Sequence, residues 1–139
     1  MDINRFTEKV QSAFQAAQSS ATREGHQQLD VEHLMMALLE QPEGLAPAIL
    51  LKTGIALDRV AERLDGELRK LPKVTSSSGA ANQIYITGRL NTLIAQAEEE
   101  ARKLKDEYIS VEHLLLAAVG ENGATGKILR EAGLDREKL

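Results

Sequence analysis

The sequence predicts an all-α fold built by duplication of a unit of four short helices. Its 139 residues make about one domain. Apolar residues recur at spacings of three and four, the pattern of amphipathic helices. The stretch 30–37, Asp-Val-Glu-His-Leu-Met-Met-Ala, returns at 110–117 as Ser-Val-Glu-His-Leu-Leu-Leu-Ala. We expect a pseudo-twofold fold of eight short helices rather than a solenoid, which needs three or more copies.

The correspondence extends in both directions from these stretches. Downstream it slips by one residue, so that Gly54 matches Gly133. We predict a single domain, 1–139, with repeats at about 1–72 and 84–139 and a flexible Ser/Gly-rich linker at 73–83. Because the second copy is the shorter, we expect the chain to be a fragment of a longer protein. Upstream pairs are Thr7 with Thr87, Val10 with Leu90, Phe14 with Ile94, Ala17 with Ala97 and Ala21 with Ala101.

Each copy contains recognisable helix starts and stops. Asp30 and Ser110 are good N-caps, because their side chains can accept an orphan backbone N–H. Gly25, Gly54 and Gly133 are expected to end helices. In the first copy the predicted helices span about 4–23, 31–39, 45–53 and 58–71. In the second they span about 84–105, 111–119 and 127–132, with the start of another at 135–139.

The composition argues against several classes of protein. A net charge of −4 is a poor match for nucleic acid or an anionic membrane. Two Phe, two Tyr and no Trp do not make a base-stacking platform. The absence of Cys excludes disulfides and thiolate metal sites. Without an apolar run of membrane-spanning length or a signal-peptide pattern, the default expectation is a soluble, cytoplasmic domain.

Gly126-Lys127 is the one fragment that suggests a phosphate-binding loop. That motif needs a glycine five residues before Gly126 and a Ser or Thr after the lysine. Here those positions hold Glu121 and Ile128. Without the hydroxyl for Mg²⁺ and the backbone nest for phosphates, no nucleotide site is expected.

The Glu-His pairs at 32–33 and 112–113 invite a metal or acid–base interpretation. Metal capture on a helix needs ligands on one face, and neither copy has the second histidine of such a motif. We therefore expect each Glu to favour the helix dipole and each His to pack at a boundary. His26, whose equivalent is Asp106, is expected to be an exposed turn residue. No catalytic or metal residue is predicted.

Four duplicated polar residues lie near helix starts: Thr7, Thr87, Glu32 and Glu112. They could form two symmetric sites, each with a hydroxyl and a carboxylate. The alternative, which spacing alone favours, is that the threonines bond locally and the glutamates only serve the dipole.

These residues together resemble a known family. The duplicated Glu-His-Leu short helix, the opening 5–9 (Arg-Phe-Thr-Glu-Lys), Gly25-His26, and 71–74 (Leu-Pro-Lys-Val) before the linker are similar to the N-terminal domain of Clp ATPases, most of all the ClpB type. The resemblance covers essentially the whole chain. It implies an eight-helix, non-catalytic domain ahead of two AAA+ modules, so that no cofactor is expected here and ATP and Mg belong to those modules.

The resemblance also implies a function. ClpB-like N-domains engage exposed segments of unfolded or aggregated client proteins and help deliver them to the ATPase ring. The implied partners are such clients, possible adaptors and an Hsp70-type chaperone system, with a homohexameric full-length protein, a monomeric isolated domain, no nucleic acid and no membrane. The implied client-binding residues are Thr7, Thr87, Ile94 in an apolar groove, Asp106, Glu112 and Glu32.

Two alternatives stay open from the sequence. One is an adaptor- or phosphoarginine-binding N-domain of a ClpC- or ClpA-type protease partner, with Glu32 and Glu112 contacting the guanidinium. The other is a small metal-dependent hydrolase built around the histidines. Met35-Met36 would suit promiscuous contacts if exposed, although a central helix favours the core for both.

Overall fold

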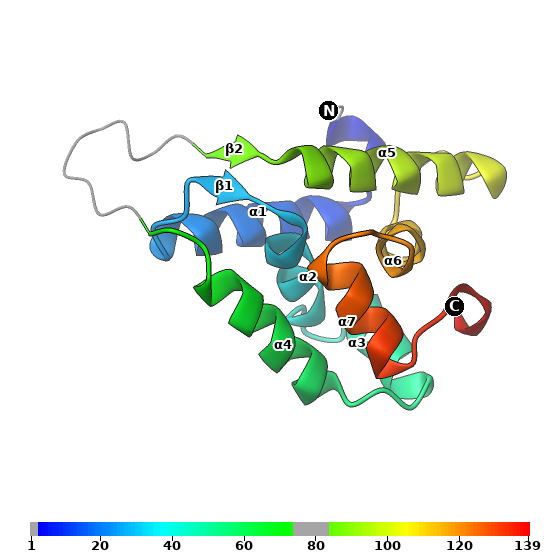
Figure 1. The fold of residues 1–139 in the computed structure, drawn as a ribbon. Helices are drawn as coiled ribbons and strands as arrows, with labels where there is room; N and C mark the ends of the chain where they lie inside the picture. Colours follow the sequence, from blue (N-terminus) through cyan, green and yellow to red (C-terminus); the bar gives the residue numbers. More distant parts are fainter. Residues whose placement is uncertain (1–2, 74–83) are drawn as a thin grey trace.

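The computed structural model describes residues 3–73 and 84–139, so the predicted linker lies outside the described residues from 74 onward. The all-α prediction is confirmed: the described segments contain seven α-helices, one two-stranded sheet and two short 3-10 helices. Two predicted helices, 31–39 and 111–119, have the predicted bounds. The elements, labelled in Figure 1, are η1 (Ile3–Arg5), α1 (Glu8–Arg23), β1 (Gln28–Leu29), α2 (Val31–Leu39), α3 (Leu45–Lys52), α4 (Leu57–Arg69), β2 (Tyr85–Ile86), α5 (Gly88–Lys103), α6 (Val111–Val119), α7 (Ala124–Ala132) and η3 (Arg136–Lys138).

The duplication in the sequence is visible in the helices. The long helices α1 and α5 have 16 residues each, and the short helices α2 and α6 have nine each. Thr7 and Thr87 are the N-caps of the long helices, where their hydroxyls accept hydrogen bonds from the backbone N–H groups three residues on, at 3.3 and 3.1 Å. The long helices run in opposite directions across one side of the molecule (Figure 1).

The start of each long helix pairs with the segment before the other repeat's short helix. Leu29 lies opposite Ile86 in the parallel sheet, and Phe6 forms a parallel bridge with Ile109. The two pairs are equivalent, because Phe6 corresponds to Ile86 and Leu29 corresponds to Ile109 in the two repeats. The backbone N–H groups of the two N-cap threonines complete the pattern, each donating to the opposite repeat at 3.1 Å. The halves are therefore joined twice by backbone hydrogen bonds.

The core lies around the two short helices. Helix α2 packs against α1 and α4 of its own repeat and also against α5 and α7 of the other, while α6 packs against α3, α5 and α7. Met35 is fully buried and Met36 partly so, as expected of a central helix. Among the described residues, no helix is both long and apolar enough to cross a bilayer.

The long helices begin later than predicted. We expected helices from 4 and from 84, but α1 begins at Glu8 and α5 at Gly88. The 3-10 helix η1 and the bridged Phe6 precede α1, and the strand β2 precedes α5; Phe6 and β2 pair with the other repeat, a contact that helical periodicity cannot reveal.

The last two predicted helices also need correction. Helix α7 begins at Ala124 rather than 127, since Gly126 belongs to its first turn. The predicted eighth helix is here only the 3-10 turn η3, in the position that α4 takes in the first copy.

Substitutions at two glycines test where α7 ends. Gly133 ends α7 in the left-handed region with φ 106°, whereas Gly66 lies inside α4 with open space where a Cβ would stand. Gly133→Ala should lower the free energy of unfolding by about 1–2 kcal/mol through backbone strain. Gly66→Ala should raise it by about 0.5–1 kcal/mol. Urea unfolding monitored by circular dichroism checks both, and equal effects of the two changes would contradict the assigned end of α7.

Candidate functional site

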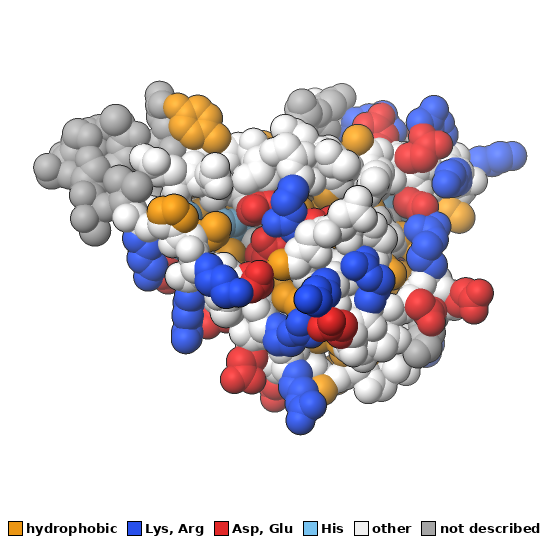
Figure 2. Space-filling model, viewed as in Figure 1, with side chains coloured by type: hydrophobic (Ala, Val, Ile, Leu, Met, Phe, Trp, Pro, Cys, Tyr) orange, Lys and Arg blue, Asp and Glu red, His pale blue; other side chains and the backbone are white. Residues whose placement is uncertain are grey.

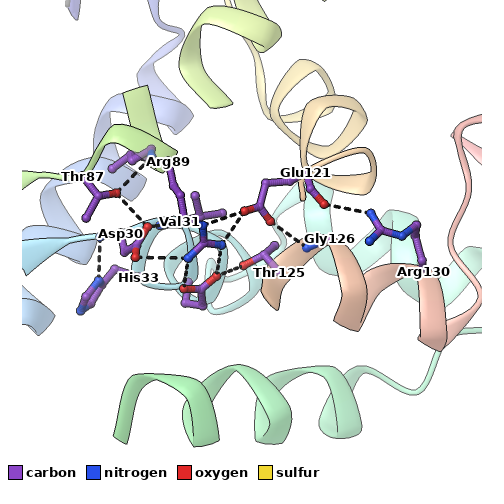
Figure 3. Close-up of polar contacts among 11 residues, drawn as sticks. Asp30, Val31, His33, Thr87, Arg89, Glu121, Thr125, Gly126 and Arg130 are labelled. Carbon is purple, nitrogen blue, oxygen red and sulfur yellow. Dashed lines mark hydrogen bonds and ion pairs between the residues drawn. The ribbon is translucent and has the colours of Figure 1, made fainter. Parts of the chain in front are cut away.

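One arginine collects three carboxylates where the two repeats meet (Figure 3). Arg89 donates from Nε and Nη2 to Glu121, from Nη1 and Nη2 to both oxygens of Glu32, and from Nη1 to Asp30, with N···O distances of 2.5–3.2 Å. All five N–H donors of the guanidinium are thereby used. This arrangement is a complete guanidinium-binding site, which the chain fills with its own side chain.

The side chains of this site come from helix starts in both repeats. Arg89 is in the first turn of α5, whereas Asp30 is the N-cap of α2 and Glu32 lies in the first turn of that helix. Two hydroxyls add further links: Thr87 donates to Asp30 at 2.8 Å, and Thr125 donates to Glu32 at 2.5 Å. Helix starts favour carboxylates, so the acids serve the helix dipole and hold the arginine at the same time.

The three carboxylates that bind Arg89 are buried, which strengthens their attraction to the guanidinium. Asp30, Glu32 and Glu121 are 5–8% exposed, whereas the Arg89 side chain is 37% exposed. Burial would raise the pKa of Glu32, but hydrogen bonds from Arg89 and Thr125, with the charge of Arg89, outweigh it and hold that pKa below its ordinary value. The hydrogen bonds to Glu32 in turn raise the pKa of Arg89.

Two glycines near the start of α7, including the Gly126 that resembled part of a phosphate loop, serve this cluster. A Cβ at Gly123 would stand 2.3 Å from Nη2 of Arg89, and one at Gly126 would stand 1.9 Å from the carbonyl oxygen of Glu121. The N–H of Gly126 donates to the Glu121 carboxylate at 3.0 Å. Arg130 donates to the Glu121 carbonyl at 2.9 Å (Figure 3). The start of α7 is thus occupied by a carboxylate of the chain, which explains both glycines without phosphate.

The pseudo-equivalent, open site in the other half has a similar helix start but keeps one of the three carboxylates, Glu112, because Ser110 replaces Asp30 and Gln41 replaces Glu121. Lys9 occupies the position of Arg89 and is exposed, and no ion pair of Lys9 occurs within 3–73 and 84–139. Glu112, the counterpart of Glu32, is exposed, and among the described residues its carboxylate accepts one hydrogen bond, from the hydroxyl of Ser110 at 3.3 Å. Gln41 stands in the place of Glu121 and donates to the backbone of Lys9 at 2.8 Å.

Each short helix has a histidine as its third residue, and the side chain of that histidine caps the helix N-terminus. Nδ1 of His33 accepts the backbone N–H of Asp30 at 3.0 Å, so its proton is on Nε2 and is donated to Nδ1 of His26 at 2.9 Å. The remaining proton of His26 then lies on Nε2, a buried atom for which the described residues provide no hydrogen-bond partner. The prediction that His26 is exposed is wrong: it is 4% exposed, because it is the hydrogen-bond partner of a buried histidine.

In the second repeat an aspartate takes the place of that histidine. Nδ1 of His113 accepts the backbone N–H of Ser110 at 2.9 Å, and Nε2 donates to Asp106 at 2.9 Å. Asp106, Glu112 and His113 have potential ligand atoms within 4.8 Å of one another. A metal would require Nε2 without its proton while Nδ1 still accepts a hydrogen bond, which would leave the ring anionic. The geometry therefore disfavours a metal here and with it the hydrolase alternative.

The six predicted site residues fall into two groups and one separate residue. Thr87 and Glu32 lie in the closed Arg89 cluster. Asp106 and Glu112 lie in the open half with Thr7, whose N–H donates to the residue before Ser110. Ile94, predicted to line an apolar groove, is packed in the core at 8% exposure, so little of it is available to a partner. Sequence reasoning missed Arg89, Asp30 as an ion-pair partner, Glu121 and Thr125.

No single charge dominates the face shown in Figure 2, where basic and acidic side chains intermix and hydrophobic side chains form small separate groups. This pattern matches the mild net charge and provides no broad patch for a highly charged polymer.

Comparisons with known proteins agree on one family. The family model described as "Clp repeat (R) N-terminal domain" matches residues 5–132. The chaperone protein ClpB of Nitratidesulfovibrio vulgaris is 45% identical over 141 aligned residues, and that of Bacillus cereus is 40% identical over 139. Each alignment covers 100% of this chain but only 16% of the relative. The chain thus spans about a sixth of the length of these relatives.

Solved structures show the same fold. The Hsp104 N-terminal domain from Candida albicans superposes with a TM-score of 0.79 at 19% identity, covering 96% of this chain and 85% of that one. A ClpV N-domain solved in complex with a VipB peptide superposes with a TM-score of 0.79 at 17% identity, covering 99% and 83%. At these identities the likeness concerns the fold alone.

Glu32→Gln and Glu112→Gln compare the contributions of the closed Arg89 site and of the open site to stability. The change keeps the shape but removes a charge from the buried cluster, so at pH 7 it should cost about 2 kcal/mol of unfolding free energy. Glu112→Gln, the matched change on an exposed residue, should stay within about 0.5 kcal/mol. Because the pKa of folded Glu32 is lowered from 4.5, its contribution is complete above that pH and disappears as the pH falls through the lowered value. Urea titrations at pH 7 and pH 3 should therefore show a smaller difference between Glu32→Gln and wild type at pH 3.

The histidine pair predicts a loss of stability in mild acid. Burial lowers the pKa of both His26 and His33 from 6.5, and the charge of His26 lowers that of His33 further. Below about pH 6.5 the unfolded chain therefore binds more protons than the folded one, and stability falls as the pH drops.

His26→Asp replaces the His26–His33 pair by an aspartate–histidine pair like Asp106–His113 of the second repeat. In such a pair a carboxylate can stabilise a charged imidazole. Thermal unfolding at pH 5, 6 and 7 should show a smaller decrease for His26→Asp than for wild type. Gln27→Asp, an exposed neighbour gaining the same charge, serves as the control. If both variants reduced the loss of thermal stability between pH 7 and pH 5 equally, the His26–His33 pair would not be the cause of that loss.

Proposed function

This chain belongs to the Clp N-terminal domain family, and we propose that it is the protein-binding N-domain of a ClpB-type disaggregase. In this proposal the domain engages exposed segments of unfolded or aggregated clients and helps to deliver them to an ATPase ring formed by the rest of a longer protein. It performs no catalysis itself, and ATP and Mg²⁺ act in the AAA+ modules.

The observation that carries the proposal is the open site around Glu112. Glu112 and Thr7 correspond to Glu32 and Thr87 of the Arg89 site, where carboxylates at a helix start hold a guanidinium, whereas Ser110 and Gln41 replace Asp30 and Glu121. In the open half, the carboxylate of Glu112 lies within 4.8 Å of that of the half-exposed Asp106, which accepts a hydrogen bond from His113, and neither acid forms an ion pair with a Lys or Arg among the described residues. Such a site suits a basic side chain of a client, bound by charge-assisted hydrogen bonds.

A shallow acidic site of this kind fits the demands on a disaggregase. Its clients differ in sequence, so binding must be weak and tolerant. Two exposed carboxylates select for charge but not for shape, and they favour fast encounter over high affinity. A fold of this kind is also found in the ClpV N-domain solved with a VipB peptide.

The phosphoarginine alternative fits less well. It requires equivalent pockets in both repeats, but Glu32 is buried and already bonded to Arg89 and Thr125. Only the Glu112 half is free to receive such a ligand.

Binding of fluorescein-labelled, permanently unfolded casein, measured by anisotropy, tests the proposal. Glu112→Gln and Asp106→Asn should each weaken binding about five- to tenfold at low salt, because each removes a charge from the open site. The wild-type affinity should fall as salt is raised.

Glu107→Gln is the matched control, since Glu107 is an exposed acid outside the site. If Glu112→Gln weakened casein binding no more than Glu107→Gln, the contribution of Glu112 would be that of any surface negative charge and not of a specific site. Undetectable binding by the wild type would overturn the client-binding function itself.

A further inference from the structure

We propose that Arg89 is a specificity-determining residue: it plugs one of two pseudo-equivalent cation sites and thereby confines binding of basic client side chains to the Glu112 half. This inference rests on the proposed client-binding function. It predicts a domain that is symmetric in fold but binds at one site only.

The Arg89 site has the stereochemistry of a ligand pocket. The guanidinium donates all of its five N–H groups, and both oxygens of Glu32 face its fork. Three carboxylates surround one cation, so the negative charge of the pocket exceeds what its occupant neutralises. A pocket of this charge would attract another guanidinium if its own occupant were removed.

Arg89 enters the pocket formed by the three carboxylates from the solvent side. A cavity of about 340 Å³ lies against the guanidinium, lined by Arg89, Thr92, Gln96 and the segment 120–123. Gly123 leaves room for the arginine, since a Cβ there would collide with it. With 37% of its side chain exposed, Arg89 behaves as a plug at the mouth of the pocket rather than as a core residue.

The other half lacks both the plug and part of the pocket. Lys9 has a single ammonium, which cannot form the two parallel hydrogen bonds of a guanidinium. Ala46, two residues after the N-cap of α3, replaces Thr125, which stands two residues after the N-cap of α7. These differences leave Glu112 exposed and available, whereas its counterpart Glu32 is 5% exposed.

Removing the plug should convert the closed half into a binding site. Arg89→Ala is expected to lower the melting temperature by about 10 °C, because it leaves three buried carboxylates unpaired. Methylguanidinium chloride at 1–20 mM should restore several degrees in a saturable manner, and equimolar sodium or methylammonium chloride should restore less. Wild type and Lys9→Ala, the matched change in the open half, should show no such recovery. Arg89→Ala combined with Glu32→Gln should lose most of it.

The absence of saturable recovery in Arg89→Ala would overturn the inference. If that variant is too unstable to fold even with methylguanidinium, the wild type decides the question by NMR. The Nε–H of Arg89 should then be slow to exchange, and the Gly126 amide, which contacts Glu121, should not shift with methylguanidinium. A freely exchanging Nε–H or a saturable Gly126 shift would mean that Arg89 does not close the pocket.

The two proposals fail separately. Casein binding by the wild type that depends on Glu112, without methylguanidinium uptake by Arg89→Ala, would reject the plug alone. Uptake by Arg89→Ala without casein binding by the wild type would reject the client-binding function and leave only a guanidinium pocket.

Discussion

Neither repeat can bury its apolar face alone, and the rest of the structure follows from this constraint. The short helix α2 is covered on one side by its own repeat and on the other by α5 and α7, while α3 rests on α6. The backbone reinforces this exchange, because the pair Leu29–Ile86 and the pair Phe6–Ile109 each join residues of different repeats. Burial that neither half achieves separately is the usual reason for duplicated units to associate.

Within this shared framework the two halves have diverged in their polar groups. Arginine replaces lysine, glutamate replaces glutamine, and the same helix start changes from an exposed acid to a buried ion cluster. The histidines diverged similarly, with one donating to a second histidine and the other to Asp106. Because the apolar positions carry the packing, the polar ones were free to acquire different roles. The proposed one-sided client binding is a consequence of that freedom.

The sequence predicted the helices well where its signals are local. The repeat, the N-caps Asp30 and Ser110 and the bounds of α2 and α6 depend on spacing and capping chemistry, which a single sequence displays. The Arg89 cluster depends on residues 57 and 32 positions away, and no spacing rule connects them. The burial of His26 was missed although its partner His33 is only seven residues away, because spacing alone does not show that the two rings meet. Comparing the repeats position by position, Lys9 with Arg89 and Gln41 with Glu121, could have indicated the asymmetry.

The double exchange of backbone pairs has a consequence for connectivity. Both junctions between the halves, and the ion cluster beside one of them, are noncovalent contacts among residues on either side of the interval from 73 to 84. The contacts described on either side of that interval hold the two halves together without a covalent bond between them. In physical terms the molecule is an intramolecular heterodimer. Its two subunits could belong to separate polypeptides and still present the same interface to each other.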